Sequence, residues 1–145
     1  MPVPLAVRRI RNDLMQLEDR PDITVSDVGD DVAFPYTVSV RITGTKGYSA
    51  PGRRAGEQEF DIILGEDFPY ERPRIRWRTG IFHPNIMPPS EGGSVCIADR
   101  DRWDFDSSLS DLILSITDLV NNPNPYNPLV SESWTAAAAW FRDNA

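Results

Sequence analysis

The spacing of apolar residues predicts three helices, one near the start of the chain and two near its end. Apolar side chains recur at helical intervals over residues 5–18, and Pro21 blocks a longer helix. A second helix is predicted to begin at Ser108, with Asp111 completing a capping pair, and a third to run from about residue 131 to Asn144. The apolar faces of these helices comprise Val7, Ile10, Leu14 and Leu17; Leu109, Leu112, Ile113, Ile116, Leu119 and Val120; and Trp134, Ala137, Ala138 and Phe141.

Alternating apolar and polar residues predict four strands between the first two helices. A short strand contains Ile23 and Val25, residues 35–43 alternate most clearly, and residues 59–65 and 74–77 follow. Because the connections are too short for helical crossovers, the strands are expected to form an antiparallel meander. The side chains that share one face of their own strand are Tyr36, Val38, Val40 and Ile42, and Phe60, Ile62 and Leu64.

Two segments show neither the helical nor the alternating spacing of apolar residues. Residues 44–57 contain four glycines and a proline, which predicts a long, flexible and exposed turn. Residues 79–107 are predicted to form a loop without regular structure, and loops of this length in compact domains are often functional. Helix, meander, long loop and two helices make an α+β fold, and 145 residues fit a single domain over residues 1–145.

Composition and charge narrow the function classes. A net charge of −7 argues against general nucleic-acid binding. A single Cys excludes an internal disulfide, one His and one Cys cannot build a zinc site alone, and no apolar run is long enough for a membrane span. Because the first residues also lack the pattern of a signal peptide, a cytoplasmic monomer without a metal or membrane partner is expected.

Basic residues are clustered despite the acidic total. Arg8, Arg9 and Arg11 follow one another in the first predicted helix, where they are either a docking face for an acidic partner or a solvated helix face. A second group lies in the middle of the chain and comprises Arg72, Arg74, Arg76 and Arg78.

The long loop holds the only His and the only Cys of the chain, His83 and Cys96. A thiolate is the strongest nucleophile among ordinary side chains near neutral pH, although a lone Cys is more often a small core residue. His83 is either a general base for that thiol or a structural group that holds the loop by hydrogen bonds to the backbone, and Pro84 favours the latter. Asn85 is either a donor to a developing oxyanion or a turn residue.

The order of these motifs resembles the ubiquitin-conjugating enzymes. The resemblance extends over nearly the whole chain, and the order and spacing of its parts carry it more than any single part. Those parts are GEDFPYERPRIRWRTGIFHPNI, with His83, Pro84 and Asn85; Cys96; Trp103; and LSDLILSITDLVNNPNPYNPL, with Pro123, Asn124, Pro125, Pro128 and Leu129.

The resemblance implies a role for each part. Cys96 would accept a ubiquitin-like modifier as a thioester from an activating enzyme and pass it to an amine or thiol. Asn85 would stabilise the oxyanion or organise the loop, with supporting structure from His83, Pro84 and Trp103. Arg8, Arg9 and Arg11 would face the activating enzyme and Tyr70 a ligase. No cofactor is implied, because ATP is used by the activating enzyme.

Departures from the family pattern affect the residues expected to lie near the acceptor amine or thiol. The stretch MPPSEGG lengthens the interval from Asn85 to Cys96, and the acid or Ser usual in the exit loop is replaced by Tyr126 and Asn127. Asn cannot act as a base, so Asp99 is a candidate substitute, together with Asp101 or Asp104. The divergence suggests a bacterial or archaeal ubiquitin-like system, with antiphage defence as a further hypothesis.

Two alternatives to a catalytic conjugating enzyme remain at the level of sequence. A scaffold of the same fold that binds ubiquitin-like proteins without catalysis would typically lack Cys96. A cysteine hydrolase would need His83 as its base.

Overall fold

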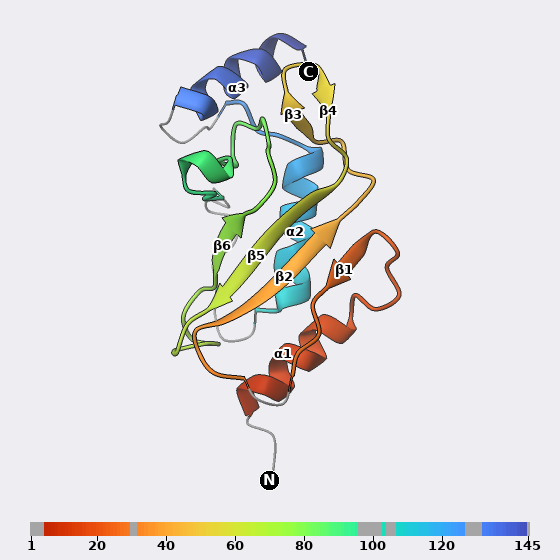
Figure 1. Ribbon diagram of the computed structural model, residues 1–145, viewed down its shortest axis with the longest axis vertical. Coiled ribbons are helices and arrows are strands. Elements are labelled where there is room, and N and C mark those ends of the chain that lie inside the picture. Colours follow the sequence, from red (N-terminus) through yellow and green to blue (C-terminus); the bar gives the residue numbers. More distant parts are fainter. Residues whose placement is uncertain (1–4, 30–31, 96–102, 104–106, 127–131, 145) are drawn as a thin grey trace.

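A computed structural model describes residues 5–29, 32–95, 103, 107–126 and 132–144 (Figure 1). It has an α+β fold, as the sequence predicts. The helices are α1 (Leu5–Met15), α2 (Leu109–Asn121) and α3 (Glu132–Asn144), and a short 3₁₀ turn, η1, covers Pro89–Glu91. The strands are β1 (Ile23–Val25), β2 (Tyr36–Ile42), β3 (Tyr48–Ala50), β4 (Arg53–Arg54), β5 (Gln58–Leu64) and β6 (Arg74–Trp77).

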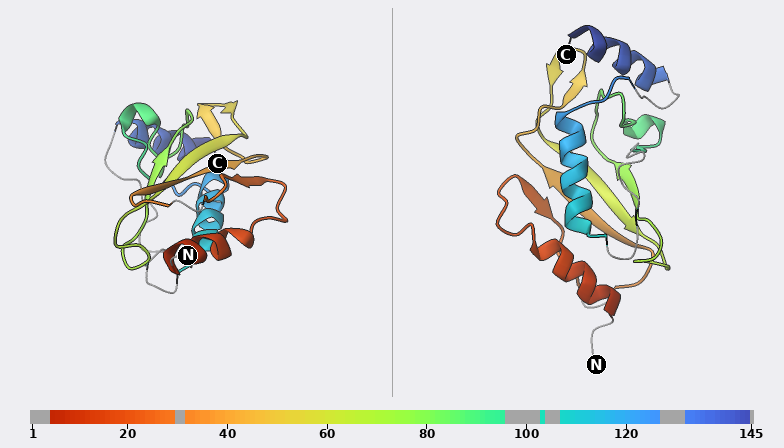
Figure 2. Two further views of the ribbon diagram at one scale, coloured as in Figure 1. Left: turned by 60° about the horizontal axis from the view of Figure 1, so that its bottom comes forward. Right: turned by 180° about the vertical axis from the view of Figure 1, so that it is seen from behind.

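Four strands form one antiparallel sheet in the order β1-β2-β5-β6, which confirms the predicted meander. Helix α2 covers one face of this sheet, and α1 lies beside the beginning of α2 (Figures 1 and 2). No helix covers the opposite face in these views. The molecule therefore has an inner sheet face toward α2 and an outer sheet face toward solvent.

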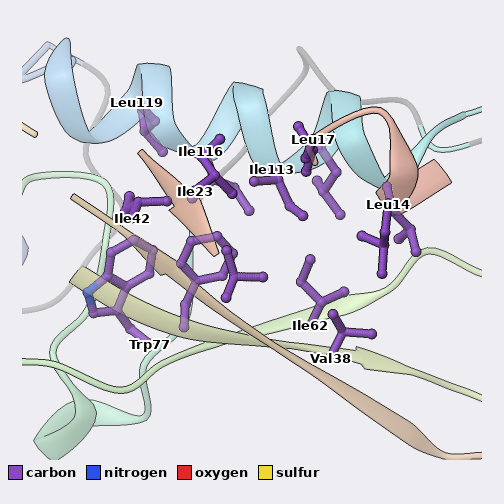
Figure 3. Packing of buried hydrophobic residues seen from close by; sticks show 14 of the residues in the cluster. Leu14, Leu17, Ile23, Val38, Ile42, Ile62, Trp77, Ile113, Ile116 and Leu119 are labelled. Atoms are coloured by element: carbon purple, nitrogen blue, oxygen red, sulfur yellow. The ribbon is translucent and has the colours of Figure 1, made fainter. Parts of the chain in front are cut away.

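The core fills the space between the inner face and the helices (Figure 3). The predicted apolar stripe of α2 is buried along its whole length, and β2 and β5 bury the side chains expected from their alternation except Tyr36, which is partly buried. On β6, Trp77 stacks on Phe60 with 4.9 Å between ring centroids. Its indole nitrogen donates to Gln58 Oε1 at 2.8 Å, which satisfies the one polar group of a ring that is fully buried.

The beginning of α2 is joined to α1 by hydrogen bonds to its unpaired backbone amides. Ser108 Oγ accepts from the amides of Ser110 and Asp111, which confirms Ser108 as the N-cap. The Leu109 amide donates to Asp13 Oδ2 of α1 at 3.0 Å, and Arg9 of α1 donates to the Ser107 carbonyl oxygen at 2.5 Å. Side chains of α1 therefore cap α2 and fix the residue that precedes its cap.

Three features of the fold differ from the sequence prediction. Helix α1 ends at Met15 rather than at residue 18, although Leu17 in the following turn is still buried. Residues 44–57 are not simply a flexible turn, because β3 and β4 pair there as a hairpin. The segment expected to lack regular structure contains η1 and an isolated bridge between Ile86 and Val95.

The hairpin is held by aromatic contacts from the far end of the chain. The Tyr48 ring lies 5.1 Å from Trp140 and 5.5 Å from Phe141, both on α3. Phe82 contacts the same two rings, at 5.9 and 6.1 Å. Ala137, Ala138 and Phe141 are buried, as predicted for α3, whereas the side chain of Trp134 lies outside the described residues. This long-range packing explains why a glycine-rich segment is paired.

The stretch 87–93 forms a loop that closes on itself. The Met87 amide donates to the Ser94 carbonyl at 2.8 Å, and Gly93 donates to the Pro88 carbonyl at 3.1 Å. The Gly93 carbonyl in turn accepts from the Trp77 amide of β6 at 2.8 Å. The extra residues between Asn85 and Cys96 thus leave the sheet edge, return to it at Gly93 and rejoin Ile86 at Val95.

Gly93→Ala should destabilise the fold strongly. Gly93 has φ +69°, and a Cβ there would lie 2.8 Å from both the N and the O of Trp77. We expect a loss of about 3 kcal/mol in the free energy of unfolding, from backbone strain and a contact with backbone that cannot move aside. Gly52→Ala is the matched control, because Gly52 has φ +73° with nothing within 4 Å, and should cost about 1 kcal/mol. Equal losses in urea unfolding would contradict the close packing at Gly93.

Candidate functional site

His83 is buried with both ring nitrogens in hydrogen bonds. Nδ1 accepts from the Asn85 amide at 3.0 Å, so Nε2 carries the proton and donates to the Leu119 carbonyl oxygen at 2.7 Å. Burial lowers the pKa of His83 to about 4, and the hydrogen bond to Leu119 opposes that shift only in part. Because Nδ1 already accepts a hydrogen bond and Nε2 carries a proton, the neutral ring has no free lone pair with which to take a proton from a thiol.

Asn85 is 3% exposed and is bonded to the backbone of Asn124 in both directions. Its Oδ1 accepts from the Asn124 amide at 2.8 Å, and its Nδ2 donates to the Asn124 carbonyl oxygen at 3.1 Å. We call this two-bond contact the Asn85–Asn124 clasp. It joins the loop after β6 to the segment that leaves α2, and it fixes which way the Asn85 amide points.

The segment that leaves α2 is ordered by short-range bonds as far as Tyr126. Asn122 caps the helix, since its backbone amide donates to the Asp118 carbonyl oxygen at 2.8 Å. The Tyr126 amide donates to Asn124 Oδ1 at 3.2 Å, and the Tyr126 side chain is 79% exposed. The sequence named Asn124 only as part of the resemblance and gave it no role, because its contribution to the clasp comes from backbone atoms that any residue except proline would carry.

Trp103 attaches the chain after Cys96 to the loop between β5 and β6. Its indole nitrogen donates to the Pro69 carbonyl oxygen at 2.6 Å, and its ring lies 6.1 Å from that of Phe68. Tyr70, which follows Pro69 in the chain, has a side chain that is 77% exposed. Trp103 and Tyr70 therefore belong to one surface region, with Trp103 partly buried beneath it.

The three arginines of α1 have different surroundings. Arg9 bonds to Ser107 and lies 3.9 Å from Asp13, while Arg11 donates to the Gly29 carbonyl oxygen at 3.1 Å. Arg8 is exposed. The guanidinium groups of Arg9 and Arg11 thus contribute to the packing of α1, and docking of an activating enzyme at the three arginines stays a prediction.

Several predicted residues lie outside the described part of the chain, namely Cys96, Asp99 and Asn127, together with Asp101 and Asp104. In the sequence, the bridge between Ile86 and Val95 stands one residue after Asn85 and one residue before Cys96. Within the described residues, no three His, Cys, Asp or Glu side chains gather as a metal site. The same residues contain no helix long and apolar enough to cross a membrane.

Comparison with known proteins identifies the family. A family model described as ubiquitin-conjugating enzyme matches residues 9–143, which is most of the chain. The chain belongs to the ubiquitin-conjugating enzyme family. Family members share the predicted reaction class of transfer of ubiquitin or a ubiquitin-like protein, and their partners include the modifier, an activating enzyme, and ligases or targets.

Two solved structures resemble the chain over most of its length. Saccharomyces cerevisiae Ubc12 has a TM-score of 0.76 and 26% sequence identity, and the match covers 100% of this chain and 75% of that one. The E2 domain of a Toxoplasma gondii ubiquitin-conjugating enzyme has a TM-score of 0.69 and 24% identity, over 94% of this chain and 86% of that one. The second similarity concerns the fold alone.

The free energy of unfolding should decrease on mild acidification because of His83. Its pKa is 6.5 in the reference state and about 4 in the folded protein, so between these values the unfolded chain binds more protons. We expect a loss of about 2 kcal/mol between pH 7 and pH 5, measured by urea unfolding.

His83→Gln is the control for this pH dependence, since His83 is the only His of the chain. The glutamine amide can still donate to the Leu119 carbonyl but does not titrate, so most of the slope between pH 7 and pH 5 should disappear. The same slope in both proteins would contradict the depressed pKa of His83.

Proposed function

We propose that the protein is a conjugating enzyme that carries a ubiquitin-like modifier on Cys96 as a thioester. In loading, the Cys96 thiolate attacks the C-terminal carbonyl carbon of the modifier, the thioester bond to the activating enzyme breaks, and the activating enzyme's cysteine leaves as a thiolate. In transfer, an acceptor amine or thiolate attacks the new thioester, the bond to Cys96 breaks, and the Cys96 thiolate is released. The proton that an amine acceptor loses passes to a base or to solvent. The protein needs no cofactor in these steps, because the activating enzyme uses the ATP.

The observation that carries this proposal is the Asn85–Asn124 clasp. An oxyanion donor must be held in a fixed orientation before the charge develops, and both polar atoms of the Asn85 side chain are fixed by Asn124. The bridge that follows Asn85 in the sequence precedes Cys96 by one residue. Family membership supports the chemistry, and these contacts support Asn85 as the group that stabilises it or orders its loop.

The remaining roles follow from the same proposal. His83 orders the loop through Leu119 and does not act as a base, because its only lone pair accepts the Asn85 amide. Trp103 supports the loop that carries Tyr70, where a ligase would bind. The activating enzyme would approach α1 at Arg8, Arg9 and Arg11. Asp99 is the proposed acceptor-side acid, since Tyr126 and Asn127 provide none.

Loading of Cys96 tests the proposal directly. Incubation with ATP, an activating enzyme and candidate modifiers from the same genome should add the mass of the modifier minus water. The adduct should be released by a thiol reductant and should be absent in Cys96→Ala. Cys96→Ser should form an oxygen ester that resists the reductant, which separates covalent loading from tight binding. Binding of a modifier without any adduct would favour the scaffold alternative.

Asn85→Ala should spare loading and slow transfer from the preloaded thioester by about 10²–10³-fold if Asn85 stabilises the oxyanion. Asn124→Ala is the matched control, because it removes the side-chain bond to the exposed Tyr126 but keeps both backbone atoms of the clasp, and it should transfer at nearly the wild-type rate. Single-turnover transfer and urea unfolding are measured for both variants. Equal losses of loading and transfer in Asn85→Ala would assign Asn85 to loop structure alone.

A further inference from the structure

The outer sheet face carries a row of arginines at one edge. Exposure alternates from residue 72 to residue 78, with Pro73 and Trp77 buried, Ile75 partly buried, and an exposed arginine at every other position. We call Arg72, Arg74, Arg76 and Arg78 the arginine row. Alternate residues of a strand are about 7 Å apart and point to the same side. Arg74 and Arg76 of β6 therefore lie about 7 Å apart on the outer face, and Arg72 and Arg78 extend the exposed row beyond the two ends of the strand.

Most of the row has no partner among the described residues. Arg78 donates to Asp61 Oδ2 at 2.7 Å, and Asp61 also accepts from Ser39 Oγ at 3.0 Å. Arg76 lies opposite Asp61 in the strand register, but the Asp61 carboxylate is engaged by Arg78 and Ser39. The side chains of Arg72, Arg74 and Arg76 form no hydrogen bond or ion pair within the described part of the chain.

The charge of the row contrasts with that of the rest of the molecule. The chain has a net charge of −7, yet three positive charges with no partner among the described residues stand side by side along one edge. At this spacing like charges repel one another weakly in water, and nothing in the core requires them. Guanidinium groups bind carboxylates through paired, geometrically defined hydrogen bonds, which a lysine ammonium cannot do. Charge complementarity thus indicates an anionic partner.

The sheet face is the more open route of approach. At the edge of β6, the Trp77 amide already donates to Gly93, so an added strand could not bond to that amide. Beside Arg78, the outer face has a shallow hollow of about 320 Å³ that is lined in part by Ser39, Arg41 and Asp61. A partner would therefore lie across the arginine row with its side chains pointing toward the sheet. The hollow would accept a small polar side chain of that partner.

We propose that the arginine row binds an extended acidic segment of a partner protein, with Asp or Glu at alternate positions. In an extended peptide these carboxylates recur at about 7 Å, which matches the row. A continuous polyanion such as nucleic acid fits less well, because Asp61 and the exposed Glu59 share the outer face and the whole chain is acidic. The arginine row does not include Cys96, and the proposed binding needs no thioester.

The test uses the whole chain and a fluorescent peptide of four Glu-Ser repeats, with binding followed by anisotropy. Arg74→Gln/Arg76→Gln should weaken binding by about tenfold, as expected for the loss of two exposed charge-assisted contacts. Arg53→Gln/Arg142→Gln is the matched control with the same change in charge at exposed sites elsewhere, and should bind like wild type. Because Arg74 and Arg76 have no partner in the described part of the chain, the melting temperature of the Arg74→Gln/Arg76→Gln variant should not fall.

Other results would overturn the proposal. No binding of the Glu-Ser peptide at low salt, or an equal loss in both double variants, would exclude a specific acidic-peptide surface. Binding of a Lys-Ser peptide, or tighter binding of single-stranded DNA with the same number of charges, would assign a different ligand class. Self-association in sedimentation that is lost in Arg74→Gln/Arg76→Gln, without peptide binding, would make a second copy of the chain the occupant.

Discussion

The hydrogen bond from His83 Nε2 to the Leu119 carbonyl oxygen connects the candidate site to the core. The last carbonyls of a helix have no partner within the helix, and a buried one is costly unless a donor reaches it. Leu119 lies on the buried stripe of α2, and His83 supplies that donor at 2.7 Å from the loop after β6. The loop is thus fixed at the end of the most deeply packed helix, and the Asn85–Asn124 clasp is built two residues beyond that point.

The same helix connects the site to α1. At the beginning of α2, the Leu109 amide binds Asp13 and the preceding Ser107 carbonyl binds Arg9. Burial raises the pKa of Asp13, while the amide and Arg9 favour its charged form. Helix α2 therefore has α1 at one end and the loop of His83 and Asn85 at the other. Helix α2 thus fixes the position of α1, the proposed docking helix, relative to the proposed catalytic loop.

Local periodicity predicted the elements whose faces are buried in the core. The apolar stripe of α2 and the alternation of β2 follow directly from which side chains are buried, so the pattern alone located both elements. The hairpin of β3 and β4 was missed because its glycines indicate a turn, whereas its pairing depends on contacts of Tyr48 with residues about ninety positions away. Long-range packing of this kind leaves no local signal.

The candidate site was predictable in its residue types but not in its geometry. The sequence singled out His83 and Asn85 and left two roles open for each. Only the positions of their partners show that Nδ1 of His83 is an acceptor and that Asn85 faces Asn124. Neither the tautomer of a ring nor the backbone partner of a side chain can be deduced from spacing. The closed loop over 87–93 likewise required the contact of Gly93 with Trp77.

The departures in sequence bear unequally on the proposed reaction. The longer interval before Cys96 is absorbed by a loop that closes between Ile86 and Val95, and Asn85 is held from the other side by Asn124, so the insertion need not displace it. The exit loop is different, because Tyr126 and Asn127 offer no carboxylate to deprotonate an acceptor. At pH 7 roughly 0.04% of a free lysine is neutral, whereas roughly 3% of a free thiol is already thiolate. Without a base, a thiol acceptor is thus favoured by roughly two orders of magnitude in the concentration of its reactive form. A lysine acceptor would need either Asp99 or a partner protein to supply the missing base.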